Sequence, residues 1–405
     1  MNATDRFLKY ISFDTQSRHD ADEYPSTGKQ KALGRYLADE LKALGVADAG
    51  MDPFGYVTGT IPGNVPGAPV LGLLAHMDTS PDAAGDGIKP RIIKGYDGGD
   101  IVLNGERGVV MPAAQFTDLA NYVGQDLIVA DGTTLLGADD KAGIAEIMTM
   151  AETLLSDRSI LHGDIRVAFT PDEEVGNGTT HFDLERFGAD FAYTVDGGGP
   201  GEISYENFNA ASAVVTFRGR SVHPGAAKNK MLNASLVAME FQAMLPGWET
   251  PEHTEGYEGY FHLTGVEGNV TDATLRYIIR DHDEPAFGDR KKKLGEIRDY
   301  LNGVYGEGAV ELRITDSYQN MKAKILPVMF LVENAERAMR ELGMAPFVRP
   351  TRGGTDGSML SWKGLPCPNL CCGGHYAHGP YEFVAAQSLE SISRMLVRLA
   401  ELSAK

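Results

Sequence analysis

The chain has 405 residues, a formal net charge of −19 at pH 7 and a pI of about 4.9. Its length allows two or three domains at about 150 residues each, and an apolar share of 42% is typical of a globular protein with a sizeable core. The acidic balance argues against non-specific binding to nucleic acid or to an anionic membrane surface.

The N-terminal segment and the cysteines bear on the compartment. Residues 1–20 lack the basic leader, apolar stretch and cleavage site of a secretory signal. No apolar run reaches the ~18 residues of a membrane span. The 3 cysteines, Cys367, Cys371 and Cys372, form an odd cluster that makes a poor disulfide framework. We therefore expect buried free thiols in a cytoplasmic protein with no nucleic-acid and no membrane partner.

The first part of the chain alternates helical spacing with short, continuous apolar runs. Residues 87–131, rich in Gly and Asp, are expected to form excursions from this pattern. Buried strands alternating with helices predict an α/β domain with a mixed, mostly parallel sheet that is covered on both faces. The predicted elements are helix 28–44, strand 69–76, helix 141–155, strand 164–170 and strand 191–195.

The pattern changes from about residue 207. The predicted order is strand 208–218, helix 231–245, strand 260–266, strand 272–281, helix 286–304 and strand 310–317. This βαββαβ order is that of the split ferredoxin-like unit. Helical spacing of the earlier type returns at 332–342, so we expect an inserted α+β domain, 207–317, within a catalytic α/β domain formed by 1–206 and 318–405.

Polar side chains follow the predicted strands at the points where they end, and others open the helix at 141–155 or lie near the C-terminus. In open α/β sheets, ligands bind outside the carboxyl ends of the strands. Histidines and carboxylates without thiolates suit Zn²⁺, Mn²⁺ or Co²⁺, and a carboxylate shared by two ions is typical of a dinuclear hydrolase. The candidate residues are His76, Asp78, Asp139, Asp140, Glu173, Glu174, Asp196, His375 and His378.

Glu173 and Glu174 stand side by side in TPDEEVG, residues 170–176, directly after an apolar run. Adjacent carboxylates repel each other, so the pair is tolerable if a cation compensates it and the two roles differ. One glutamate would bind a metal, and the other would act as general base on a water whose pKa the metal lowers towards ~7. A solvated acidic turn is the alternative, and the neighbouring strand-end residues argue against it.

The chain resembles the peptidase T family, the tripeptide aminopeptidase branch of the dinuclear zinc metallopeptidases that include carboxypeptidase G and the aminoacylases. The likeness covers nearly the whole chain. It includes LLAHMDTSPD, LLGADDKAGIAEIM, HGDIRVAFTPDEEVG, YTVDGGGPGE, TEGYEGYFHL, RGGTDG and GLPCPNL. The resemblance implies a zinc-peptidase-like catalytic domain. It also implies that the inserted domain serves as a lid or as the dimerisation domain of a homodimer.

The resemblance also assigns metal ligands by position. His76 and Asp196 would bind one zinc ion, Glu174 and His378 the other, and Asp139 would bridge them. Cobalt or manganese would serve as substitutes in vitro.

Catalytic roles follow from the same resemblance. Glu173 would be the general acid/base, and the carboxylate of Asp78 would orient the His76 imidazole. Asp140 is expected to cap the following helix instead of binding metal. His223, in SVHPG, would stabilise the oxyanion, often across a dimer interface in this clan; the alternative is a turn histidine before Pro224.

Four further residues are implied in substrate binding. Arg280 would grip a substrate carboxylate in a bidentate manner, and a surface arginine at a strand end is the alternative. Asn207, Arg352 and Gly353 would line the peptide pocket.

One stretch departs from the family pattern. The family reads Gly-Gly-aromatic-Asn-aromatic-His-Gly before the last ligand, whereas residues 373–379 read GGHYAHG. The following Gly379 and the spacing to Glu382 keep the assignment of His378. We expect the pocket wall beside it to differ, and His375 is an alternative ligand.

The predicted function is a metal-dependent aminopeptidase that removes the N-terminal residue of short peptides, preferentially tripeptides. An N-acyl-amino-acid deacylase or a carboxypeptidase of the same clan is the first alternative. A catalytically silent peptide- or metal-binding protein is the second, and Glu173 argues against it because pure binding needs no free base. A dinucleotide enzyme is weakly supported, since GGGPG lacks the G-x-G-x-x-G spacing.

Overall fold

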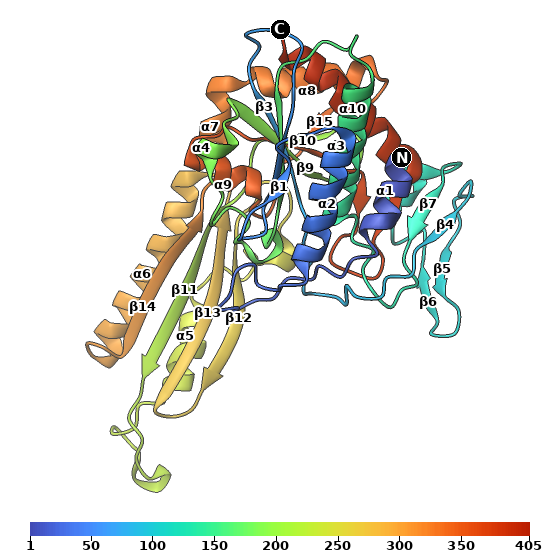
Figure 1. Ribbon diagram of the computed structural model, residues 1–405. Coiled ribbons are helices and arrows are strands. Elements are labelled where there is room, and N and C mark those ends of the chain that lie inside the picture. The colour runs from blue at the N-terminus through green and yellow to red at the C-terminus, as the bar shows by residue number, and fades with distance from the viewer. The chain divides into compact units, whose positions relative to one another are not determined.

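The computed structural model describes residues 1–405, which form two compact units. The first unit comprises Met1–Tyr205, Ala323–Arg349 and Thr355–Lys405, and the second comprises Glu206–Lys322 and Pro350–Gly354 (Figure 1). The short second segment of the second unit lies far along the chain from the first, and the sequence pattern gave no sign of it.

The first unit is built on an eight-stranded mixed sheet. Its neighbouring central strands β8, β3, β9 and β16 run parallel, and the outer strands add antiparallel pairs. This confirms the predicted mixed, mostly parallel α/β fold. In spatial order the strands are β1 (Gly50–Met51), β2 (Val57–Ile61), β8 (Ile165–Thr170), β3 (Leu71–His76), β9 (Phe191–Gly197), β16 (Asn369–Cys371), β10 (Glu202–Ser204) and β15 (Phe347–Val348).

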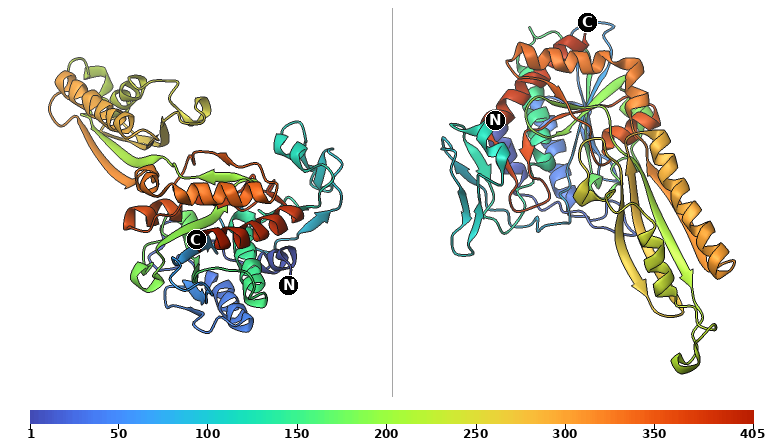
Figure 2. Two further views of the ribbon diagram at one scale, coloured as in Figure 1. Left: turned by 90° about the horizontal axis from the view of Figure 1, so that it is seen from above. Right: turned by 180° about the vertical axis from the view of Figure 1, so that it is seen from behind.

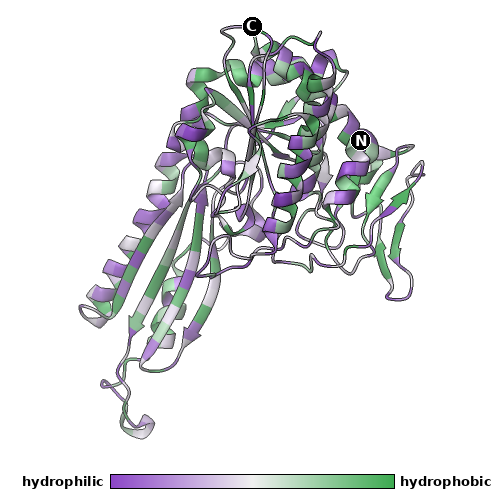
Figure 3. Cartoon of the chain, viewed as in Figure 1, coloured by the Kyte–Doolittle hydropathy of each residue, from purple (hydrophilic) through white to green (hydrophobic).

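Helices cover both faces of this sheet, which explains why its central strands are apolar along their length. Leu74, Ala168 and Ala192 pack on one face in a cluster with α4 (Leu184–Phe187) and α9 (Asp356–Lys363). On the other face lie α2 (Gln30–Leu44) and α3 (Ala138–Ser156), as Figure 1 shows. Figure 3 shows the apolar strands and the largely apolar α3 between them and the surface. The remaining helices of this layer are α1 (Ala3–Tyr10), α8 (Phe330–Glu341) and α10 (Ala386–Ser403). The short α7 spans Lys322–Ile325.

The region expected to form excursions contains short strands that no periodic pattern could reveal. Strands β4 (Arg91–Ile93) and β7 (Leu127–Val129) join β18 (Phe383–Ala385) and β17 (Gly374–His375) in a four-stranded sheet. A hairpin of β5 (Ile101–Asn104) and β6 (Val109–Met111) and the 3₁₀ helix η1 (Thr117–Tyr122) lie between β4 and β7. This small sheet therefore holds both ends of the loop that carries His378.

The second unit has the predicted βαββαβ order and an antiparallel sheet with strand order β12-β13-β11-β14. Strand β13 alternates between buried and exposed residues, as a sheet with one open face requires. Helices α5 and α6 both pack on the other face, as Figure 2 shows from behind. The elements are β11 (Asn209–Arg218), α5 (Ala234–Ala243), β12 (Tyr260–Gly268), β13 (Asp272–Asp281), α6 (Glu284–Tyr305) and β14 (Val310–Tyr318).

Across both units, none of the helices combines the length and the apolar composition that a bilayer crossing requires.

Candidate metal centre

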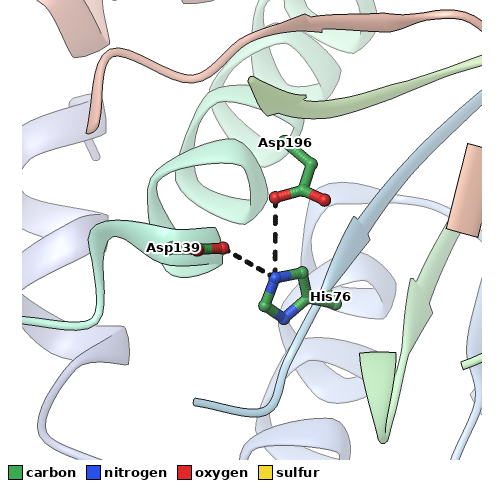
Figure 4. Close-up of side chains that lie close together, drawn as sticks. All are labelled: His76, Asp139 and Asp196. Atoms are coloured by element: carbon green, nitrogen blue, oxygen red, sulfur yellow. Dashed lines mark hydrogen bonds and ion pairs between the residues drawn. The ribbon is translucent and has the colours of Figure 1, made fainter. Parts of the chain in front are cut away.

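Two groups of metal-binding side chains meet in the first unit and share one residue. The first consists of His76, Asp139 and Asp196, and the second of Asp139, Glu174 and His378; within each group the ligand atoms lie within 4.8 Å of one another. Figure 4 shows the first group, in which both carboxylates point at the His76 ring. The structure thus brings together all five residues that were predicted as ligands.

The topology of the sheet explains this convergence. Strands β8, β3 and β9 are parallel neighbours, so their carboxyl ends lie at one edge. His76 is the last residue of β3, Asp196 lies near the end of β9, and Glu174 lies in the turn after β8. Asp139 is at the start of α3, and the loop between β17 and β18 supplies His378.

Asp139 faces both histidines with different oxygens. Its Oδ1 lies 2.8 Å from His76 Nε2, and its Oδ2 lies 3.3 Å from His378 Nε2. Its own N–H donates to Glu382 Oε1 at 3.0 Å, while Glu382 Oε2 accepts the N–H groups of Leu136 and Gly137 at 2.7 Å each. Glu382 therefore fixes the backbone of Asp139, the residue that belongs to both metal-binding groups.

The orientation of His76 differs in detail from the prediction. Its Nδ1 hydrogen-bonds the backbone carbonyl of Asp78 at 3.0 Å, whereas the Asp78 carboxylate lies 3.5 Å away. Nδ1–H donation to the carbonyl leaves the Nε2 lone pair facing Asp139 and Asp196. The main chain of Asp78 thus orients the ring, and its side chain serves another purpose.

The Asp78 carboxylate holds the turn that carries the glutamate pair. Its two oxygens accept the N–H groups of Glu173 and Glu174 at 3.0 and 3.2 Å. Asp172, just before the pair, has a positive φ of 59° and accepts hydrogen bonds from Ser26 and Gln30. A non-glycine residue in this left-handed region is costly unless its surroundings hold it there, and these contacts do so.

Glu173 belongs to neither metal-binding group. It lines a small space together with His76, Thr170, Asp196 and Asp356. Burial, together with the charge of Asp196, raises the pKa of Glu173 well above its ordinary value. A carboxyl with a raised pKa beside a metal centre is suited to take up and return a proton.

The electrostatics of the ligand set favour a cation. Hydrogen bonds that the His378 ring donates to the carboxylates of Asp139 and Glu174 raise the pKa of His378 to about 11. Burial by itself lowers the pKa of His76, yet Asp196 and Asp139 raise it well above its ordinary value. Burial and the charge of Asp139 raise the pKa of Glu174 to about 8. The carboxylates therefore stabilise positive charge at these points, which a divalent ion would supply.

One buried oxygen without a hydrogen-bond partner also indicates that these residues are suited to bind a cation. Glu174 Oε1 is buried and has no hydrogen-bond partner, an arrangement that normally costs free energy. Coordination of a metal ion would satisfy it. The donor set consists of imidazoles and carboxylates, and none of the three buried thiols belongs to either group. The residues therefore fit a pair of divalent cations.

The structure also bears on Asp140, which was expected to cap a helix, and on His375, which was considered as an alternative metal ligand. Asp140 is a helix cap as predicted: its Oδ1 accepts the N–H of Gly143 and its Oδ2 the N–H of His76, both at 3.2 Å. His375 belongs to neither metal-binding group. Its Nε2 instead bonds the hydroxyl of Tyr122 at 2.6 Å, so the structure gives no support to His375 as a competing ligand.

Aromatic residues of the segment 87–131 pack against the loop that carries His378 and hold it in place. Tyr376 and His378 both have positive φ, 55° and 64°. The ring of Phe116 contacts Tyr376 and Tyr381 with centroid distances of 4.9 and 4.8 Å. The N–H of Asp118 also donates to the Tyr376 hydroxyl at 3.3 Å. The excursion therefore serves as the support of a candidate metal ligand.

His223 and Arg280 lie in the second unit. His223 is exposed, and its Nδ1 accepts the N–H of Gly225 at 3.2 Å, which places the proton of the neutral ring on Nε2. Arg280 donates from Nη1 to the carbonyl of Ile279 at 3.0 Å, and its guanidinium lies 5.2 Å from the Tyr318 ring centre. Both sets of contacts are local, so the roles of His223 at the oxyanion and of Arg280 in substrate binding stay predictions.

The other predicted substrate residues have local structural contacts. Asn207 is fully buried, and its side-chain amide bonds the backbone of Phe208, Gln319 and Met321. Arg352 donates to the carbonyls of Thr254, Gly256 and Glu258 and lies over two aromatic rings. A Cβ on Gly353 would meet nothing within 4 Å. Asn207 and Arg352 thus stabilise the second unit, and pocket roles for these three residues stay predictions.

Sequence reasoning missed Asp356 as an individual residue. Its Oδ2 accepts the Thr170 hydroxyl at 2.7 Å at the end of β8, and burial raises its pKa to about 7. The only sequence signal was its place in the glycine-rich stretch RGGTDG. The expectation for the loop 352–357 was that it lines the substrate pocket, with glycines that let the backbone approach the peptide; the pattern did not reveal a buried acid beside Glu173.

A family model described as Peptidase family M20/M25/M40 matches residues 129–402. The peptidase T of Alkaliphilus oremlandii is 51% identical over 407 residues, covering 100% of both chains. That of Desulfitobacterium hafniense (strain Y51) is 52% identical over 402 residues, covering 99% of this chain and 98% of the relative. The chain belongs to the peptidase T branch of peptidase family M20/M25/M40.

Solved structures agree with this assignment at the level of the fold. Aminopeptidase PepT from Bacillus cereus superposes with a TM-score of 0.79 at 24% identity, covering 100% of this chain and 98% of that one. A Bacillus subtilis protein described as a dinuclear metal binding peptidase from the M20 family gives a TM-score of 0.66 at 13% identity, with 99% and 97% covered. The M20 peptidase fold is therefore shared over the whole chain.

Proposed function

We propose that this M20-family peptidase is a metal-dependent aminopeptidase that releases the N-terminal residue of short peptides, with tripeptides preferred. The observation that carries the proposal is Glu173, a carboxyl with a raised pKa that lies beside two metal-binding groups and belongs to neither. The full-length relatives named peptidase T support the choice of substrate.

The proposed metal content is two divalent ions, with zinc preferred. His76 and Asp196 would hold one ion, Glu174 and His378 the other, and Asp139 would contact both. Such ions, when bound, supply Lewis acidity to the attacking water and to the scissile carbonyl. The two oxygens of Asp139, each directed at a different histidine, suit the bridging role.

Glu173 moves the proton in this mechanism. Its carboxylate takes a proton from the attacking water and later gives it to the leaving nitrogen. The enclosing residues keep bulk water away, which is the cause of its raised pKa. Asp78 keeps the glutamate backbone in place through the hydrogen bond to its N–H.

The second unit would contribute the remaining roles. An Nε2–H on exposed His223 is a donor of the kind that an oxyanion requires, and Arg280 would bind the peptide carboxylate. We also propose a homodimer through this unit. A cytoplasmic location is part of the proposal, supported by three cysteines that are buried and unpaired.

A mass-spectrometric assay of the zinc- or cobalt-loaded protein tests the proposal. The substrates are a free tripeptide, its N-acetylated form, the matching dipeptide and an N-acyl amino acid. We expect release of only the first residue from the free tripeptide and loss of that activity with a chelator.

Other outcomes separate the alternatives. Turnover of the N-acyl amino acid alone would place the protein with the deacylases, and release of the last residue of the peptide would make it a carboxypeptidase. Metal binding without turnover of any substrate would indicate a binding protein and contradict the proposal.

A further inference from the structure

A cavity of about 880 Å³ lies in the first unit beside the metal-binding groups. Asp139 and Asp196 form part of its wall, whereas Glu173 does not. Asp196 also lines the small space that contains Glu173 and Asp356. Asp196 therefore stands between two regions, one with the proposed general acid and one with the large cavity.

This division orients the peptide. Glu173 gives its proton to the leaving nitrogen, so the part that leaves, beginning with the second residue, lies on the Glu173 side. The first residue is on the opposite side of the scissile carbon. That side is the cavity, whose wall includes Asp139, which both metal-binding groups share, and Asp196 of the first group.

We propose that the cavity receives the side chain of the first residue of the peptide and favours aromatic first residues. The inference rests on the proposed aminopeptidase function. Four rings contribute to the wall, and stacked or edge-on contacts between rings add to the gain from burial. They belong to Tyr122, Phe347, His375 and Tyr376.

Two of these rings, those of Tyr122 and His375, are held in place. His375 bonds the Tyr122 hydroxyl at 2.6 Å and stacks on Phe383, with ring centres 4.9 Å apart and an interplanar angle of 12°. A rigid aromatic wall loses little conformational entropy when a ligand ring packs against it. This gives the departure at His375 from the family pattern a role in substrate choice.

Two small residues keep the cavity open. A Cβ on Gly199 would lie 2.9 Å from Cε1 of His375, so glycine avoids a clash at the wall. Ala377, directly before His378, lines the cavity with a single methyl group. A large side chain at 377 would occupy the space that we assign to the first residue.

The test compares kcat/KM for Phe-Gly-Gly, Ala-Gly-Gly and Gly-Phe-Gly. We expect the unmodified enzyme to favour Phe-Gly-Gly over Ala-Gly-Gly by about tenfold or more, since burying a phenyl ring is favourable. Ala377→Trp and Ser391→Trp, the latter at a lining position on α10, should each lower this ratio at least tenfold. Leu161→Trp, on an exposed loop outside the cavity, should leave the ratio within about twofold.

An unchanged ratio in both tryptophan variants would overturn the inference, and so would a loss confined to Gly-Phe-Gly, which would assign the cavity to the second residue. These results differ from failure of the proposed function. If the unmodified enzyme releases alanine from Ala-Gly-Gly, the aminopeptidase function stands whatever the ratios show. If it releases no first residue from any peptide, the proposed function fails and this inference with it.

Discussion

The carboxylate of Asp78 holds the backbone of Glu173, with 3.0 Å between its Oδ1 and the Glu173 nitrogen. The other carboxylate oxygen accepts the N–H of Glu174 at 3.2 Å, and the backbone carbonyl of Asp78 accepts a hydrogen bond from Nδ1 of His76 at 3.0 Å. Asp78, which follows the end of β3 by two residues, thus positions both the candidate ligand His76 and the proposed general base Glu173. Because main-chain and side-chain atoms serve the two purposes, mutation of the side chain can separate them.

Asp78→Asn should lower kcat while sparing metal binding. The carbonyl that orients His76 stays, but an amide NH₂ replaces one of the two acceptors that face the glutamate N–H groups. We expect kcat to fall about 10- to 100-fold, measured with a tripeptide substrate alongside metal content by plasma mass spectrometry. Asp86→Asn, an exposed residue in the following loop, is the matched control. Parallel loss of metal and activity would contradict the separation.

Glu173→Gln should abolish most turnover and keep the metals, because Glu173 belongs to neither metal-binding group. An amide cannot take a proton from water, so we expect kcat to fall by at least about 10²- to 10⁴-fold. Glu174→Gln is the matched comparison one residue along and should lose metal, since its carboxylate lies 2.8 Å from His378. Full activity in Glu173→Gln would remove this residue from the mechanism.

Glu146 should make the protein less stable as pH rises. Both of its carboxyl oxygens are buried without a hydrogen-bond partner, and burial together with the charge of Asp140 raises its pKa well above the ordinary value of a glutamate. Above about pH 4.5 the unfolded state loses this proton while the folded state keeps it, so the free energy of unfolding falls by up to about 1.4 kcal/mol per pH unit until the folded pKa is reached.

Glu146→Gln removes that dependence. Compared with the unmodified protein, its thermal midpoint should rise more at pH 8 than at pH 5, by a few degrees, in calorimetry of the metal-loaded protein. Glu152→Gln, on the same helix with a partly exposed carboxylate, serves as control. An equal shift at both pH values would show that Glu146 does not titrate in this range.

Gly178→Ala should destabilise the protein and reduce its activity. A Cβ at this position would lie 2.1 Å from Oδ1 of Asp356, so the Asp356 carboxylate and its bond from Thr170 would have to move. Overpacking of this kind costs about 1–3 kcal/mol, measurable by urea unfolding. Gly28→Ala, where a Cβ would meet nothing within 4 Å, should leave the midpoint nearly unchanged. Equal behaviour of the two variants would contradict the close packing at Gly178.

The three cysteines should be inert in the folded protein. Cys367, Cys371 and Cys372 are at most 3% exposed, and burial raises the pKa of Cys371 to about 12. The thiolate is the reactive form, so we expect no labelling by Ellman's reagent at pH 8 and three thiols per chain in guanidinium chloride. Rapid labelling of the native protein would show that this region opens.

The periodicity of apolar residues in the sequence was sufficient to locate the longer helices and strands. Strand β13 begins and ends where the sequence predicted, and α2, β8 and α8 differ from their predicted ranges by at most two residues at either end. Strands of two or three residues, such as β15 and β17, escaped prediction because so short a run has no periodicity. Helix α10 was not assigned bounds either, although its spacing is regular.

The sequence by itself determined which side chains could form the metal centre, because the carboxyl ends of parallel strands meet at one edge of the sheet. Only the tertiary structure decided how they are held. Asp172 is bonded by Ser26, 146 residues earlier, and Asp139 by Glu382, 243 residues later. The cavity beside Asp139 likewise arises from segments that are distant in the chain. Contacts of this kind depend on the tertiary fold of the whole chain, and the spacing of apolar and polar residues along a short segment carries no information about them.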